Sequence, residues 1–124
     1  MNTKITGDFG ERCAVAHLKK NGYKIVECNF KTKISEIDII AYDGDCLCFI
    51  EVKTRSSTEY GLACEAVDYR KQKKIISGAS LYMSLHNVSS AVRFDVVEVY
   101  IRKGILSTPY KINVIKNAFD ASGR

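Results

Sequence analysis

Two apolar runs separated by two residues constrain the fold of this chain more than any other feature. The runs cover residues 35–43 and 46–54, are rich in Ile, Val, Phe and Tyr, and have Gly44-Asp45 between them. A Gly-Asp pair between two strand-like runs is a typical signal of a two-residue hairpin turn. With that turn, Asp43 faces Cys46 and the pairing continues outward. The sequence therefore predicts an antiparallel hairpin of known register.

This register brings charged residues together at one end of an otherwise apolar hairpin. Asp38 is predicted to lie opposite Glu51, and Glu36 opposite Lys53. Paired residues on adjacent strands have β-carbons about 5 Å apart. Two carboxylates at that distance repel each other, and partial burial raises the cost of ionising both. A different interpretation is a surface salt-bridge network at a sheet edge, in which Glu36 pairs with Lys53.

A divalent cation between the two carboxylates would remove their repulsion. Carboxylate oxygens on a strand pair suit Mg²⁺ or Mn²⁺. A metal held there can polarise a phosphoryl oxygen and lower the pKa of a bound water, and a nearby ammonium can stabilise developing charge. The hairpin therefore indicates phosphate-ester chemistry.

Length and charge narrow the class of protein. A chain of 124 residues predicts a single domain, 1–124. It contains no apolar run of about 18 residues and no apolar signal-peptide core, so we expect a cytoplasmic protein with no membrane association. The five cysteines are expected to be reduced. A net charge of +5 favours an anionic partner such as nucleic acid.

The remaining pattern predicts a layered α/β domain of order α-β-β-β-α-β-β. Because the central hairpin is apolar on both faces, its sheet must be covered on both, with Ile37 expected on the same face as Ile39 and Ala41. The other elements are predicted as follows: a helix over 7–20 stopped by Asn21-Gly22, a strand over 23–30 with a bulge or a twist, a loop over 55–63, a helix over 65–85, strands over 92–100, 105–106 and 111–115, and a helical or loose tail from residue 117.

Each predicted helix contributes one candidate site residue. Glu11 lies on the apolar stripe of the first helix, where it either favours the positive helix end or points toward the acidic cluster. Lys71 falls on the stripe between Val67 and Ile75 of the second helix, which indicates that it points toward the sheet. The neighbouring basic residues are expected to form a solvated face.

Several of these motifs together resemble a known family. The segments GDFGERCAVAHLKKNGYKIV, SEIDIIAYDGDCLCFIEVKTR and RFDVVEV, with a late NAF, resemble the YraN-like bacterial proteins, a group related to the PD-(D/E)XK nuclease superfamily. The resemblance runs from Gly7 to Phe119. It implies a restriction-endonuclease-like core with a mixed central sheet flanked by helices, similar to that of Holliday junction resolvases.

The resemblance also implies roles for individual residues. Asp38 and Glu51 would bind the metal, and Lys53 would be the motif lysine. Glu11 and the backbone carbonyl of Val52 would complete the metal site. Glu36, the acidic residue before Asp38, would be a supporting residue of the site. We expect it to pair with Lys53 or Arg55 of the strand that follows. The family usually has Gly where this chain has Ser35, so the loop entering the site is expected to differ here.

These observations support two main functional hypotheses. The first is a Mg²⁺- or Mn²⁺-dependent endonuclease acting on DNA more than RNA, with branched or structured DNA among its substrates. Phosphate contacts would then come from four basic residues: Arg55, Arg70, Lys71 and Lys74. Cleavage of a junction would require two active sites and hence a homodimer. The second is a non-catalytic nucleic-acid-binding protein with the same fold. A thiol metal site at Cys46 and Cys48 is a third interpretation, which no zinc-type spacing supports.

Overall fold

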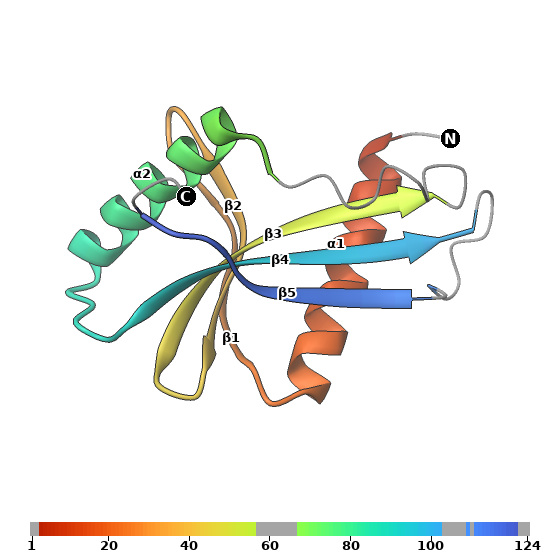
Figure 1. The fold of residues 1–124 in the computed structure, drawn as a ribbon, viewed down its shortest axis with the longest axis horizontal. Coiled ribbons are helices and arrows are strands. Elements are labelled where there is room, and N and C mark those ends of the chain that lie inside the picture. The colour runs from red at the N-terminus through yellow and green to blue at the C-terminus, as the bar shows by residue number, and fades with distance from the viewer. Residues whose placement is uncertain (1–2, 57–66, 103–108, 110, 122–124) are drawn as a thin grey trace.

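The computed structural model describes residues 3–56, 67–102, 109 and 111–121, and the following statements concern those residues. The chain forms two helices and five strands in the predicted order: α1 (Thr3–Lys20), β1 (Lys24–Lys31), β2 (Glu36–Asp43), β3 (Cys46–Ser56), α2 (Tyr69–Leu85), β4 (Val92–Ile101) and β5 (Lys111–Phe119). The strands make one sheet of order β1-β2-β3-β4-β5 (Figure 1). The β3–β4 pair is parallel and the other pairs are antiparallel, so the sheet is mixed.

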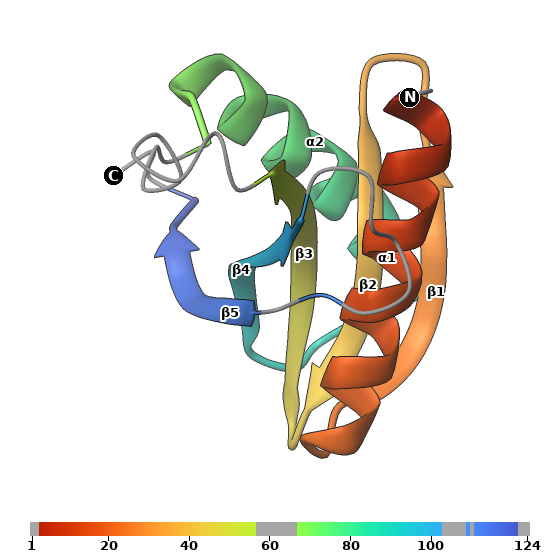
Figure 2. The ribbon, with the colours of Figure 1, turned by 90° about the vertical axis from the view of Figure 1, so that its right-hand side faces the viewer.

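One helix covers each face of the sheet (Figure 2). Between α1 and the sheet lies a core that includes Ala14, Leu18 and Ile50. The core on the other face is built around Phe49, Ile75 and Tyr82 and lies between the sheet and α2. The prediction of an α/β domain with a two-sided apolar sheet is confirmed.

The central hairpin follows the predicted register. Asp43 pairs with Cys46 across the turn, where Gly44 has a φ of 61°. The ladder continues as far as Ile39–Ile50 and then ends. Beyond this pair a side chain replaces the backbone acceptor: Asp38 Oδ2 accepts the Val52 N–H at 2.8 Å.

The face assignment of one hairpin residue is corrected. Ile37 packs in the α2-side core, whereas Ile39 belongs to the α1-side core, although alternation predicts a shared face. The change occurs at Asp38, directly after the last β2–β3 ladder pair. It brings Ile37 against α2, where a β-carbon added at Gly78 would lie 3.3 Å from Ile37 Cδ1.

Both helices end where the sequence predicts. Asn21 N–H donates to His17 O, Tyr23 N–H donates to Leu18 O at 2.9 Å, and Gly22 has a φ of 92°. These bonds are those of a Schellman-type C-terminus with glycine in the left-handed conformation. Helix α2 ends at a His86 C-cap, followed by Asn87 with a φ of 52°.

The predicted start of the second helix is wrong. Helix α2 begins at Tyr69 and not at Glu65, because the Asp68 side chain caps it by accepting the Lys71 N–H at 2.9 Å. An Asp at the N-cap satisfies one of the free amide groups of the first turn.

Three further element boundaries differ from the prediction. Helix α1 begins at Thr3 and not at Gly7. Strand β3 continues to Ser56 because its ladder with β4 extends to Ser56–Ile101, so Arg55 lies in a strand and not in the predicted loop. Strand β5 continues to Phe119, with a left-handed residue at Asn117 (φ 55°) where the tail was expected to leave the sheet. The rest of the predicted loop and the strand at 105–106 lie outside the described residues. Of the bulge or twist predicted for the first strand, the structure shows a shift of register between Ile25 and Glu27, as a bulge produces.

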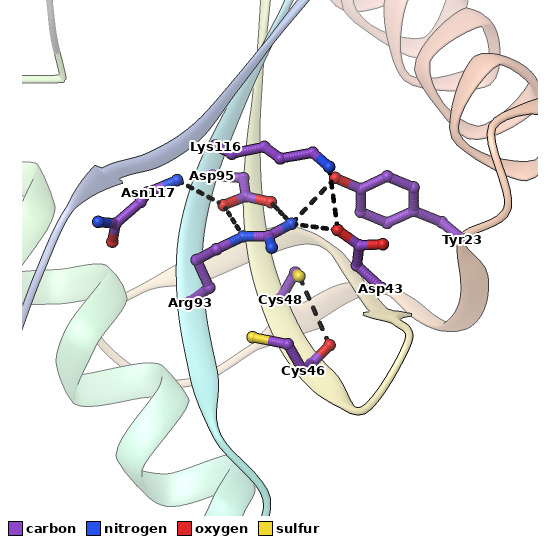
Figure 3. A network of polar contacts seen from close by, with 8 residues as sticks. All are labelled: Tyr23, Asp43, Cys46, Cys48, Arg93, Asp95, Lys116 and Asn117. Carbon is purple, nitrogen blue, oxygen red and sulfur yellow. Dashed lines mark hydrogen bonds and ion pairs between the residues drawn. The ribbon is translucent and has the colours of Figure 1, made fainter.

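A buried polar network fastens the end of the sheet that carries the hairpin turn (Figure 3). The fully buried Asp95 accepts two bonds from Arg93, of 2.8 and 2.9 Å, and one from the Asn117 N–H. The Arg93 Nη2 also donates to Asp43 and to the Tyr23 hydroxyl. These contacts link β2, β4, β5 and the start of β1. Because a half-satisfied buried carboxylate is costly, the network favours this one strand arrangement.

Candidate active site

The candidate site is a pair of carboxylates on neighbouring strands, the half-buried Asp38 on β2 and the buried Glu51 on β3. Glu51 is only 4 % exposed. Both side chains line one cavity of about 370 Å³ between the sheet and the first turns of α2. Besides Asp38 and Glu51, the charged residues of this acid-pair pocket are the following: Glu36, Asp68, Arg70, Lys71 and Lys74.

Burial and the neighbouring Glu51 alter the ionisation of Asp38. Burial, followed by the charge of Glu51 and a hydrogen bond to it, raises the pKa of Asp38 to about 8. The Val52 N–H acts in the opposite direction, because it donates to the Asp38 carboxylate. Desolvation and a like charge both disfavour ionisation, so the pair binds a proton or a cation readily.

Lys71 supplies the cation in the structure. Its Nζ forms an ion pair with Glu51 Oε2, although the Lys71 side chain remains 49 % exposed. Burial would lower the pKa of Lys71, but the hydrogen bond and the charge of Glu51 raise it above its usual value. The sequence-based expectation that Lys71 points toward the sheet is confirmed.

Arg70 and Lys74 complete a basic rim on α2. Both are exposed, and both line the acid-pair pocket beside Lys71. Their position follows from the Asp68 cap, which starts α2 directly above the pocket so that its first two turns face the carboxylates. Acids inside and cations at the rim can bind a metal ion and a phosphate group side by side.

Glu11 lies beside the acid pair but in a different cavity. It lines a cavity of about 480 Å³ between α1 and β1 together with Cys28 and Asn29, and a hydrogen bond joins it to Asn29. Burial raises the pKa of Glu11 in spite of that bond, with Glu36 and Glu51 among the negative neighbours. Glu11 is thus within electrostatic range of the pair without sharing its pocket. Its role as a metal ligand stays a prediction.

Lys53 and Arg55 continue the same strand beyond the pocket. Lys53 is two residues after Glu51, and its register partner on β4 is the buried Glu98, which accepts bonds from the Tyr100 hydroxyl and Asn113. Neither Lys53 nor Arg55 is a lining residue of the acid-pair pocket. Their predicted catalytic and phosphate-binding roles are therefore left to experiment.

The expected pairing of Glu36 is wrong. Among the described residues Glu36 makes no ion pair with Lys53 or Arg55. The β2–β3 ladder ends at Ile39–Ile50, and Glu36 is paired instead with Lys31 of β1. Glu36 is exposed at the pocket mouth.

No cluster of three His, Cys, Asp or Glu side chains with metal-binding geometry is found in the part of the chain that the structure describes. The candidate site is therefore built on two carboxylates. The thiols of Cys46 and Cys48 lie at the other end of the hairpin, where Cys48 donates to the Cys46 carbonyl. They lie beside the Arg93 network (Figure 3).

Sequence reasoning missed one residue of the pocket and one buried ion pair at the opposite end of the sheet. Asp68 reaches the pocket because it caps α2, and an Asp followed by a basic run was a usable N-cap signal. The buried Asp95–Arg93 pair was also missed, although the charged residues inside the strand pattern VRFDVVEV were a visible sign. A charge in a strand otherwise rich in Val predicts a buried partner.

Fold and site together define a class: a mixed α/β protein with a paired-carboxylate pocket beneath a basic helix. More particularly, the chain belongs to the family described as "Uncharacterised protein family UPF0102", which matches residues 10–99. The YraN-like resemblance is confirmed by this match. No helix among the described residues has the length and apolar character needed to span a membrane.

Similar proteins cover nearly the whole chain. A UPF0102 protein of Clostridioides difficile is 48% identical over 120 residues, which is 96% of this chain and 100% of the relative. One from Caldanaerobacter subterraneus subsp. tengcongensis is 48% identical over 120 residues, 96% of this chain and 98% of the relative. A third, from Alkaliphilus metalliredigens, is 45% identical over 118 residues, 94% and 99% of the two chains.

Proposed function

We propose that this protein is a Mg²⁺- or Mn²⁺-dependent endonuclease that hydrolyses DNA phosphodiesters. The proposal includes a restriction-endonuclease-like core of the PD-(D/E)XK superfamily and branched DNA among the substrates. The observation that carries it is that the half-buried Asp38 and the buried Glu51 line one pocket together with three basic side chains of one helix. Buried like charges this close call for a cation, and a basic rim suits a polyanion.

The donor set fits a hard divalent cation. Mg²⁺ is commonly held by one or two carboxylates, with water and substrate phosphate completing its octahedron. Asp38 and Glu51 would supply those carboxylates, with the Val52 carbonyl as an expected third ligand. Bound there, the ion would polarise a phosphoryl oxygen and make a bound water more acidic.

The protein's own groups would position and neutralise the substrate. The Val52 N–H holds the Asp38 carboxylate in a defined orientation. Lys71, already at the carboxylates, would bind a non-bridging phosphate oxygen once a cation takes over its partner Glu51. Arg70 and Lys74 would bind flanking phosphates, and Lys53 is the expected group that orients the attacking water.

One observation favours a second function, binding of nucleic acid without cleavage. Lys71 already compensates Glu51, so the acid pair is partly neutralised without a metal ion. A protein that used this arrangement permanently would bind DNA equally well in EDTA and would not cut it in Mn²⁺.

Metal titration followed by cleavage assays separates these functions. Mn²⁺ is titrated by calorimetry into wild type, Asp38→Asn and the control Asp45→Asn, whose carboxylate is exposed in the hairpin turn. We expect wild type and the control to bind and Asp38→Asn to lose binding while melting as a folded protein. The same three proteins are then incubated with linear, flapped and four-way-junction DNA, and only wild type and Asp45→Asn should cleave.

Two results would overturn the nuclease proposal. One is the absence of metal binding by wild type, even with DNA present. The other is unchanged binding by Asp38→Asn, which would place the metal elsewhere. If Asp38→Asn fails to fold, Glu51→Gln provides the second variant.

A further inference from the structure

We infer that the seam between the β1–β2 turn and α2 is a track for a single nucleic-acid strand that leads away from the acid-pair pocket. The inference rests on the proposed function only in taking nucleic acid as the ligand. The seam is a cavity of about 760 Å³ lined by six residues: Lys31, Thr32, Lys33, Ile34, Ser77 and Leu81. The turn lies alongside α2 (Figure 1).

The seam continues directly from the acid-pair pocket. Ile34 lines both cavities, so the two hollows meet at this side chain. Their charges are different: the pocket mixes carboxylates with cations, whereas the seam lining contains Lys31 and Lys33 and no carboxylate. A polyanion that leaves the pocket along the seam would therefore meet cations alone.

The turn is held in one conformation against the helix. Thr32 Oγ1 accepts the N–H groups of Ile34 and Ser35, at 3.2 and 3.0 Å, and the Thr32 N–H donates to Ser35 O at 2.8 Å. Gly78 lets α2 approach, since a β-carbon there would lie 2.6 Å from Ser35 Oγ. The lysines are consequently presented from a fixed backbone, which lowers the entropic cost of binding.

The apolar side chains of the seam indicate what kind of strand fits. Ile34 is 60 % exposed and Leu81 44 % exposed, one from each wall of the seam. Aliphatic side chains can pack against the faces of unstacked bases, which a duplex keeps covered. Phosphates on the lysines and unpaired bases on Ile34 and Leu81 together describe a single strand, such as a flap or the arm of a branched substrate.

Length-dependent binding tests the inference. Anisotropy is measured in EDTA with labelled oligothymidylates of about 4 nucleotides, which span the pocket alone, and about 12 nucleotides, which cover both cavities. The variant is Lys31→Ala/Lys33→Ala. The matched control is Lys20→Ala/Lys24→Ala, an equal charge change on two exposed residues near the junction of α1 and β1.

We expect the seam variant to weaken binding of the long oligonucleotide about 5- to 10-fold and of the short one less than 2-fold, as loss of two phosphate contacts implies. Leu81→Ser should weaken binding of the long oligonucleotide alone, because Leu81 lines the seam and not the acid-pair pocket, and the control should change neither. Equal losses for both lengths, or equal losses in variant and control, would overturn the track. Binding of a Glu-rich peptide at the seam, without binding of either oligonucleotide, would also overturn the track.

Failure of this inference can be told apart from failure of the nuclease proposal. The binding assay contains no metal, and the seam variant should bind Mn²⁺ as wild type does. A length-dependent loss without any metal binding would leave the track intact and remove the nuclease. Metal binding and cleavage without length-dependent binding would support the nuclease proposal and overturn the track.

Discussion

Asp38 combines a structural and a chemical role in one side chain. Its carboxylate accepts the Val52 N–H where the backbone ladder of the hairpin ends, and it lines the same pocket as Glu51. The same carboxylate thus orients the strand that carries its partner. Lys71 is the ionic partner of Glu51, so the two carboxylates and this lysine form one cluster in the pocket.

The stability of the metal-free protein should depend on pH through Asp38. Burial and then Glu51 raise its pKa from 3.8 to about 8. Between these values the folded protein holds a proton that the unfolded chain has lost. The free energy of unfolding should therefore fall as pH rises from about 4 to about 8, by at most about 1.4 kcal/mol per pH unit.

Urea unfolding in EDTA at pH about 5 and about 8 measures this effect. Asp38→Asn cannot ionise, so it should lose the decline and exceed wild type in stability at the higher pH. Asp45→Asn should follow wild type. A wild-type stability that rises across this range would show that Asp38 is ionised in the folded protein.

At the scale of elements, two glycines set how closely the helices lie on the sheet. A β-carbon at Gly10 would clash with Thr54 Oγ1, so α1 contacts β3 one residue before Glu11. Gly78 has the corresponding position where α2 meets the turn at Ser35. These close approaches decide which side chains of each helix reach which cavity.

Gly10→Ala should destabilise the protein although alanine is the better helix former. Overpacking costs about 1–3 kcal/mol, and the gain in helix propensity is about 1 kcal/mol. The effect is measured by urea unfolding. In a double-mutant cycle, Thr54→Ala should recover much of the loss, because the clashing hydroxyl is removed. Additive losses would show that the contact at Thr54 is not the cause.

At the scale of the whole molecule, positive charge lies on both parts of the path that a polyanion would follow. The net charge is only +5, and Arg70, Lys74, Lys31 and Lys33 all line the pocket or the seam. In the pocket the cations lie beside carboxylates, whereas the seam lining contains Lys31 and Lys33 and no carboxylate, so the local field is most positive along the seam.

Binding of a single strand should therefore depend steeply on salt and little on base sequence. Four phosphate contacts of about −0.7 each predict a slope of log K against log salt near −3. The seam variant should reduce the steepness by about 1.4. Anisotropy titrations over a range of KCl concentrations, with two unrelated base sequences, provide the measurement. A slope near zero, or a strong sequence preference, would contradict phosphate contact.

Local sequence determined the hairpin, the order of the elements, the two-sided sheet and the helix ends. It also determined that Asp38 and Glu51 are neighbours, because strand alternation and a two-residue turn fix the register. Tertiary structure alone decided that Glu11 lines a second cavity and that Glu36 pairs in register with β1. It also decided that the β1–β2 turn and α2 together line the seam. Those outcomes depend on contacts between residues far apart in the chain, at Gly10–Thr54 and Gly78–Ser35, and spacing within one element carries no information about them.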